Sequence, residues 1–138
     1  MREQTNLSND QLRKLLGEIK TIAVVGLSDK PERPAYGVSG YLIRHGYTVI
    51  PVNPRGESVF GLQGYKTLSE IPVKIDLVDF FLGGDKIAPV VEEALQLGVD
   101  RYWLQEEVVN QEVYDKLLSL GKSVIMDACI LKVRERLL

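Results

Sequence analysis

The sequence predicts an α/β fold, a doubly wound parallel sheet of about five strands with helices on both faces. Short, continuous apolar runs recur along the chain, segments with apolar residues at helical spacing separate them, and glycine or proline marks most junctions. Parallel strands that are covered on both faces read as such continuous apolar runs. The 138 residues suit a single domain spanning residues 1–138.

The first helix is expected to begin at Ser8, because Ser8 and Gln11 have the spacing of a capping box. A strand at residues 21–25 follows, and after a polar loop with two prolines a helix is expected over about residues 37–45. The next strand, residues 47–52, contains Pro51, which cannot donate to a sheet ladder. Pro51 is therefore expected at the end of the strand or at an unpaired position.

The second half of the chain continues the alternation after a loop at residues 57–71, in which one helical turn is expected at residues 67–70. Further strands are expected at residues 75–81, 101–105 and 123–126, and helices at about residues 86–97, 110–120 and 130–138. In such a Rossmann-like arrangement the ligand lies at the carboxyl ends of the strands, near the point where strand order reverses. Those ends are residues 26–28, 53–55, 81–83, 105–107 and 127–129.

Composition argues against several classes of protein. Seventeen Lys plus Arg against nineteen Asp plus Glu leave no basic excess for nucleic acid, and no apolar run approaches the roughly 18 residues of a membrane span. The charged first twenty residues show no signal peptide. A single cysteine, Cys129, permits no intramolecular disulfide, so we expect a cytoplasmic protein. The single histidine, His45, permits no multi-histidine metal site and is expected to cap a helix.

A strand, a glycine turn and a helix open the chain's first βαβ unit, and this order predicts a phosphate-binding loop. Gly26 ends the strand and Gly37 opens the expected helix, but the strict G-x-G-x-x-G dinucleotide pattern is absent. The loop between the two glycines offers a hydroxyl and two cations for a diphosphate, from Ser28, Lys30 and Arg33.

The end of the second βαβ strand discriminates between nucleotides. An NAD site places Asp or Glu there, whereas this chain has Asn53, Pro54 and Arg55. Arginine at this position favours a phosphorylated ribose, which is found in NADP as a 2′-phosphate and in coenzyme A (CoA) as a 3′-phosphate. The alternative is an exposed arginine in a turn, without a ligand.

Six motifs in order carry a resemblance to a known family, over about residues 20–131: IAVVGLSDKPERPAYGVSGYL, GYTVIPVNPRGESVFG, DLVDFF, APVVEEALQLG, WLQ and MDAC. On these motifs the chain resembles the small CoA-binding domain proteins, including the stand-alone bacterial YccU-like proteins. It is similar, more distantly, to the N-terminal domain of the succinyl-CoA synthetase α-subunit.

The resemblance implies CoA or an acyl-CoA as the ligand. It implies that the diphosphate and adenosine lie over Gly26, Leu27, Ser28 and the start of the following helix, and that the loop lining comprises Lys30, Arg33, Pro34, Tyr36 and Gly37. It further implies that Asn53, Pro54 and Arg55 hold the ribose phosphate, and that Phe81, Leu82 and Gly83 border the adenine or the pantetheine.

Three departures from the family pattern affect the pantetheine end. Leu82 and Gly83 replace two arginines, and Ile130 follows Cys129 where the family has proline. Glu107 replaces a glycine. The glycine would allow a positive φ or the close approach of a ligand, whereas Glu107 adds bulk and negative charge.

The favoured function is CoA binding without catalysis by the chain itself, since no base or nucleophile is expected beside the phosphate loop. One alternative is an NADP-dependent oxidoreductase. Another is a ligand-regulated interaction subunit or homodimer, in which Tyr102, Trp103 and the last helix form a surface instead of core. A third is a mixed disulfide between Cys129 and CoA, against a buried structural thiol.

Overall fold

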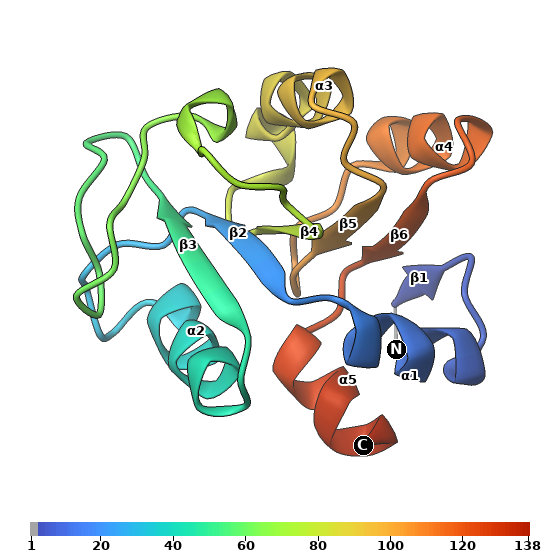
Figure 1. Ribbon diagram of the computed structural model, residues 1–138. Helices are drawn as coiled ribbons and strands as arrows, with labels where there is room; N and C mark the ends of the chain where they lie inside the picture. Colours follow the sequence, from blue (N-terminus) through green and yellow to red (C-terminus); the bar gives the residue numbers. More distant parts are fainter. Residues whose placement is uncertain (1–2) are drawn as a thin grey trace.

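The computed structural model describes residues 3–138 and contains a six-stranded sheet of order β1-β6-β5-β4-β2-β3 (Figure 1). The predicted parallel strands are confirmed as β2 (Thr21–Val25), β3 (Thr48–Val52), β4 (Leu77–Phe80), β5 (Arg101–Leu104) and β6 (Ser123–Met126). A further strand, β1 (Gln4–Thr5), pairs antiparallel with β6. The expected strand number omitted β1, because two residues are too few to show a period.

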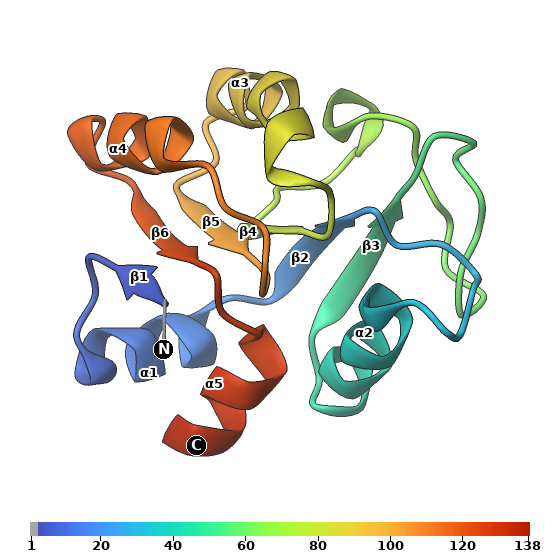
Figure 2. The same cartoon turned by 180° about the vertical axis from the view of Figure 1, so that it is seen from behind.

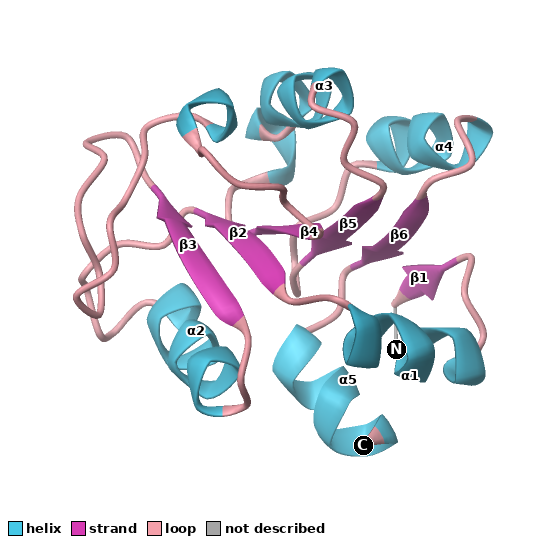
Figure 3. Cartoon of the chain, viewed as in Figure 1, coloured by secondary structure: helices cyan, strands magenta, loops and turns pink. Residues whose placement is uncertain are grey.

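Helices cover both faces of the sheet, as predicted (Figures 2 and 3). One face packs against α1 (Asn9–Glu18), α2 (Pro34–Arg44) and α5 (Ile130–Leu137). The other packs against α3 (Ala88–Gln96), α4 (Gln111–Ser119) and the 3₁₀ turn η1 (Leu68–Glu70), while a second turn, η2 (Gly84–Lys86), precedes α3. No helix within residues 3–138 has the length and apolar character needed to cross a membrane.

Strand β2 shows why its sequence is continuously apolar. Ile22 and Val24 belong to the core beneath α1, α2 and α5, whereas Ala23 and Val25 belong to the core beneath α3 and α4. Alternate side chains therefore enter opposite cores, and neither face of the strand meets water. Tyr102 and Trp103 of β5 are also fully buried at 0% exposure, so they belong to the core and the alternative of an interaction surface is wrong for them.

The strand order reverses between β2 and β4. The chain passes from β2 to β3 on one side and then crosses to β4 on the other, and β2 pairs with both in parallel. The Phe81 N–H donates to the Val25 carbonyl at 2.8 Å, and the Gly26 N–H donates to the Val52 carbonyl at 2.8 Å. These bonds hold the carboxyl ends of three strands together at the expected ligand-binding edge.

Pro51 lies inside β3, opposite Val24 of β2. Since β3 is the outer strand, one side of its backbone faces away from the sheet. The Pro51 carbonyl accepts from the Tyr65 N–H at 3.0 Å on that side, and in a parallel strand the nitrogen of a residue faces the same way as its carbonyl. The missing N–H is therefore at an unpaired position, as predicted.

Helix α2 begins at Pro34, three residues before the predicted start at Gly37. Proline suits the first helical position because its fixed φ is already helical and its missing N–H has no partner there. Pro34 and Tyr36 are thus helical residues and not loop residues. His45 is the C-cap of this helix, as predicted.

The segment predicted as one helix over residues 86–97 is the turn η2 followed by α3, with Pro89 in the first turn of α3 as expected. The strand predicted from residue 75 begins at Leu77. Asp76, just before it, uses its carboxylate to accept the Lys20 and Thr21 N–H groups, both at 2.9 Å. The predicted turn at residues 67–70 is confirmed as η1 with a capping box from Thr67.

Candidate functional site

A pocket of about 740 Å³ opens at the carboxyl edge of the sheet. Its lining comes from the end of β2, the first turns of α2, the segment after β4, the segment after β5 and the first residues of α5. We call it the main pocket. It lies at the reversal of strand order, where the sequence predicted the ligand.

A second hollow of about 150 Å³, which we call the side pocket, adjoins the main pocket. Gly26 and Leu82 line both. The side pocket is otherwise bounded by the end of β3, the segment before η1 and α3, including Asn53, Lys66 and Glu93. The shared residues make the two pockets neighbours on either side of the β2 and β4 ends.

Gly26 is required where the two pockets meet. Its φ of +96° is a left-handed conformation that other residues rarely adopt. A Cβ added there would lie 2.6 Å from the Phe81 carbonyl oxygen. Glycine therefore allows the ends of β2 and β4 to approach closely, and leaves backbone exposed to a ligand.

The first turn of α2 forms one wall of the main pocket and is open to an anion. Arg33, the N-cap, makes no side-chain capping bond, and the first turn contains no acidic residue. A Cβ added at Gly37 would meet no atom within 4 Å. Pro34 has no N–H, and the Tyr36 N–H donates to the Arg33 carbonyl at 3.1 Å. The positive dipole end of the helix therefore supplies the attraction for a negatively charged group.

The structure divides the predicted site residues among three environments. Lining the main pocket are Gly26, Arg33, Pro34, Gly37, Phe81 and Leu82. Lining the side pocket are Asn53 and Pro54, together with Gly26 and Leu82. Lining neither are Leu27, Ser28, Lys30, Tyr36, Arg55 and Gly83.

Two residues in the last group have structural roles. Leu27 is fully buried and anchors the loop after β2 in the core beneath α2. Tyr36 packs on Phe60 with ring centroids 4.4 Å apart, which attaches the loop at residues 57–65 to α2. Both side chains therefore support the loop geometry from outside the pockets.

Asn53 is 5% exposed, and its amide is occupied by the protein. Its Nδ2 donates to the carbonyls of Leu27 and Glu57, both at 3.0 Å, and its Oδ1 accepts the Glu57 N–H at 2.8 Å. Asn53 thus ties the end of β3 to the loop after β2, and its amide positions this loop.

The cation in the side pocket is Lys66, whereas Arg55 lies outside it. The Arg55 side chain is 84% exposed, with its Nε 3.9 Å from a Glu57 carboxylate oxygen. Lys66 was absent from the predicted site because it lies in the loop at residues 57–71, which has no readable period. Glu93 of α3 accepts the Leu68 and Ser69 N–H groups, at 3.3 and 3.1 Å, and so fixes the segment that carries Lys66.

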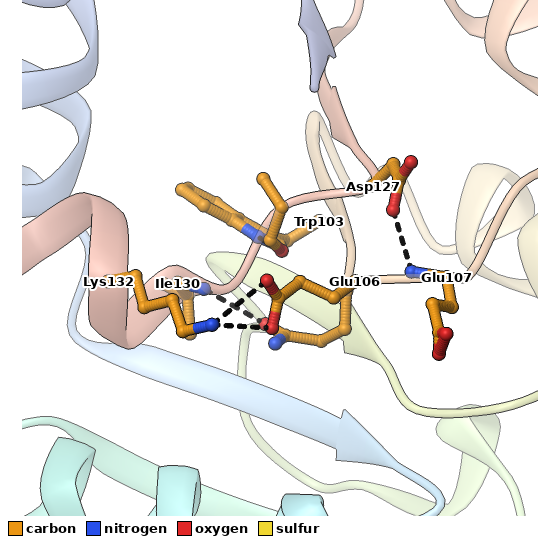
Figure 4. Close-up of polar contacts among 8 residues, drawn as sticks. Trp103, Glu106, Glu107, Asp127, Ile130 and Lys132 are labelled. Carbon is orange, nitrogen blue, oxygen red and sulfur yellow. Dashed lines mark hydrogen bonds and ion pairs between the residues drawn. The ribbon is translucent and has the colours of Figure 1, made fainter. Parts of the chain in front are cut away.

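The opposite end of the main pocket is built from the ends of β5 and β6 (Figure 4). Gln105, only 3% exposed, accepts the Ile130 N–H at 3.2 Å, and the Trp103 indole N–H donates to the Ala128 carbonyl at 2.8 Å. Lys132 pairs with Glu106 at 3.1 Å, and this hydrogen-bonded carboxylate raises the pKa of Lys132. Gln105, Glu106 and Lys132 lie at or beside the strand ends where the sequence predicted a ligand. None of them was predicted as a site residue, because no ligand-binding motif in the sequence includes them.

Glu107, the residue in place of the family's glycine, keeps a left-handed backbone with φ +68°. Its N–H donates to the Asp127 carboxylate at 2.7 Å (Figure 4). Asp127 itself has φ +59°. The rim of the pocket therefore keeps the backbone conformation that a glycine would adopt, even though Glu107 stands in its place. Because Glu107 and Asp127 both carry side chains, their left-handed conformations are strained.

The Glu107→Gly variant is expected to be more stable than the native chain by about 1 kcal/mol, because a left-handed conformation costs other residues about 1–2 kcal/mol and glycine gives part of this back in chain entropy. Urea unfolding followed by tryptophan fluorescence measures the change. A Glu112→Gly variant on helix α4 is the control, and is expected to lose stability. A destabilised Glu107→Gly variant would contradict the strain argument.

Cys129 lines the main pocket as the N-cap of α5 and is 7% exposed. The favoured interpretation of a buried thiol agrees with this position in the core. The alternative of a mixed disulfide with CoA is not tested and remains a hypothesis. Within residues 3–138 no cluster of His, Cys, Asp and Glu side chains has the arrangement of a metal site.

The fold defines a Rossmann-like α/β protein whose pockets lie at the reversal of strand order. The family model described as CoA binding domain matches residues 20–135, and the chain belongs to this family. The sequence resemblance to CoA-binding domain proteins is thereby confirmed.

Close relatives have nearly the same extent. The uncharacterized protein YneT of Bacillus subtilis is 39% identical over 125 residues, which cover 91% of this chain and 93% of YneT. A solved structure of a hypothetical protein from Pyrococcus horikoshii is 38% identical with a TM-score of 0.91, over 96% of this chain and 93% of that chain. The same fold therefore occurs in a solved protein of similar length.

The family also occurs within larger enzymes. The acetate–CoA ligase (ADP-forming) I subunit alpha of Pyrococcus furiosus is 33% identical over 87 residues, 58% of this chain but 19% of that subunit. The dinucleotide forming acetyl-coenzyme A synthetase 1 of Ca. Korarchaeum cryptofilum superposes with a TM-score of 0.68 and 29% identity, over 85% of this chain and 27% of that chain. The chain spans only a small part of these enzymes.

Proposed function

We propose that the protein binds CoA or an acyl-CoA, and that it supplies no catalysis of its own. The observation that carries the proposal is the pair of adjoining pockets around Gly26, in a member of the CoA binding domain family. CoA is a long ligand with a phosphorylated nucleotide at one end and an apolar arm at the other. Two adjoining pockets of unequal size suit such a ligand.

The positively charged groups around the two pockets indicate which way round the proposed CoA ligand lies. The diphosphate lies beside Gly26, Arg33 and the first turn of α2, where the positive end of the helix dipole favours an anion. The nucleotide enters the side pocket, with its 3′-phosphate near Lys66 and the flexible Arg55. The pantetheine arm then extends into the main pocket, past Phe81 and Leu82 toward Gln105.

Calorimetric titration with CoA, 3′-dephospho-CoA and NADPH tests the proposal. CoA is expected to bind more tightly than the other two ligands, and Lys66→Ala is expected to weaken CoA by about tenfold or more, because a charge-assisted contact contributes about 1.5–3 kcal/mol. Arg55→Ala is expected to have a smaller effect, because its side chain is 84% exposed. Lys66→Ala and Arg55→Ala should change the affinity for 3′-dephospho-CoA little, because this ligand lacks the 3′-phosphate.

Lys74→Ala provides the control, since this lysine lines neither pocket of the site. Tighter binding of NADPH than of CoA would replace the proposal with an NADP-dependent oxidoreductase. Failure of CoA, acetyl-CoA and NADPH to bind would remove the nucleotide proposal and leave the ligand-regulated interaction subunit.

A protein that binds CoA without transforming it acts as a carrier or a sensor. Either role needs a second protein that receives the CoA or responds to its binding, so the proposal includes a partner protein. The relatives named as ligases place a similar segment within larger enzymes, which supports a partner that supplies the chemistry. We place this function in the cytoplasm, in keeping with the single cysteine, and assign it to a single domain of residues 1–138, either alone or as a homodimer.

A further inference from the structure

We infer that Glu107 makes the main pocket selective against CoA thioesters whose acyl group ends in a carboxylate. The ligand class is then CoA itself and thioesters of short, uncharged acyl groups. This inference rests on the proposed function, because the direction of the bound CoA determines which residues meet the acyl group. It concerns a position where this chain departs from its own family pattern.

The main pocket has a different charge at each end. Arg33 and the first turn of α2 lie at the end assigned to the diphosphate. Glu106 and Glu107, together with Lys132, line the part of the pocket at the carboxyl end of β5, which β4 separates from β2. An arm that leaves the diphosphate and passes Phe81 therefore brings its thioester to the acidic end.

The two carboxylates at that end are not equivalent. Glu106 is paired with Lys132, whose ammonium contacts both of its oxygens at 3.1 and 3.2 Å. Within the chain from residue 3 to 138, the structure gives the Glu107 carboxylate no ion-pair partner. Its negative charge therefore remains available to act on a ligand, while Lys132 is already engaged by its neighbour (Figure 4).

The backbone keeps Glu107 at the rim. Its left-handed φ of +68° and the 2.7 Å bond from its N–H to Asp127 hold the residue between β5 and β6. At an effective dielectric constant of about 20, the repulsion between two carboxylates about 6 Å apart exceeds the thermal energy several-fold. A terminal acyl carboxylate at this end of the pocket is therefore disfavoured.

Butyryl-CoA and succinyl-CoA test the inference, because their acyl chains are of similar length and differ in a terminal methyl or carboxylate. Calorimetry at low ionic strength with the full chain is expected to show succinyl-CoA binding at least tenfold more weakly than butyryl-CoA. Glu107→Gln keeps the size of the side chain and removes its charge. This variant should tighten succinyl-CoA several-fold and leave butyryl-CoA and CoA unchanged.

The matched control is Glu112→Gln on α4, which removes the same charge from an exposed residue that lines neither pocket. It should leave the ratio of the two affinities as in the native chain. Equal affinities for succinyl-CoA and butyryl-CoA, or a ratio that Glu107→Gln does not change, would overturn the inference while CoA binding still stood. Failure of CoA itself to bind would instead remove the proposed function.

Discussion

Replacing Gly26 with alanine is expected to destabilise the protein by at least about 2 kcal/mol and to weaken CoA more than a hundredfold. The new Cβ would lie 2.6 Å from the Phe81 carbonyl oxygen, closer than such atoms approach. The φ of +96° adds the cost of a left-handed conformation to this clash. Relief requires the ends of β2 and β4 to separate, and both proposed binding pockets are lined by Gly26.

Urea unfolding and calorimetry measure the two effects on the same preparation, and circular dichroism confirms that the variant is folded. Gly17→Ala in α1 is the matched control, because a Cβ added there meets nothing within 4 Å. It should raise stability by up to about 1 kcal/mol, as alanine favours a helix over glycine, and leave binding unchanged. Native stability and affinity in Gly26→Ala would refute the close approach described here.

Asp79 is expected to make the protein less stable as the pH rises above about 4. It lies in β4 between Val24 and Trp103, is 0% exposed, and within residues 3–138 neither carboxylate oxygen has a hydrogen-bond partner. Burial raises the pKa of Asp79 well above its usual range. The folded protein therefore holds a proton that the unfolded chain releases near pH 4.

The sign follows from this difference. Because the pKa is higher in the folded state, stability is greatest below the unfolded pKa and falls as the pH rises toward the folded pKa. The loss from this one group is about 1.4 kcal/mol for each pH unit in that range. Asp79→Asn removes the titration, so its stability relative to the native protein should increase with pH at about this slope.

Urea unfolding of both proteins from pH 4 to pH 8 gives the difference directly. Other titrations cancel in it, including that of Asp100, whose pKa is lowered by a hydrogen bond from Lys122. A pH-independent difference between Asp79→Asn and the native chain would show that the buried carboxyl is not protonated.

Much of the fold could be predicted because its signals are local. The alternation of apolar runs and helical spacing placed β2 to β6 and their helices, and the family motifs identified the CoA binding domain. The misplaced boundaries have equally local causes. Pro34 was read as a loop residue although it begins α2, and β1 has only two residues.

The candidate site divides in the same way. Gly26, Arg33 and Leu82 could be predicted, since Gly26 and Leu82 follow predicted strands and Arg33 is a cation of the predicted loop after Gly26. Lys66 could not, because it belongs to a loop without a period and reaches the side pocket only when Glu93 of α3 fixes that loop. Arg55 has the expected type and spacing, but its side chain is 84% exposed and lines neither pocket.

By itself, the sequence determined the order of strands and helices, the edge of the sheet where a ligand would lie, and the family. These depend on residue patterns that act over a few neighbours. Only the tertiary structure decided which side chains share a pocket, that Glu107 keeps a left-handed backbone, and that Asp79 is buried without a partner. The physical reason is that such contacts join segments far apart in the chain, whose packing no local pattern describes.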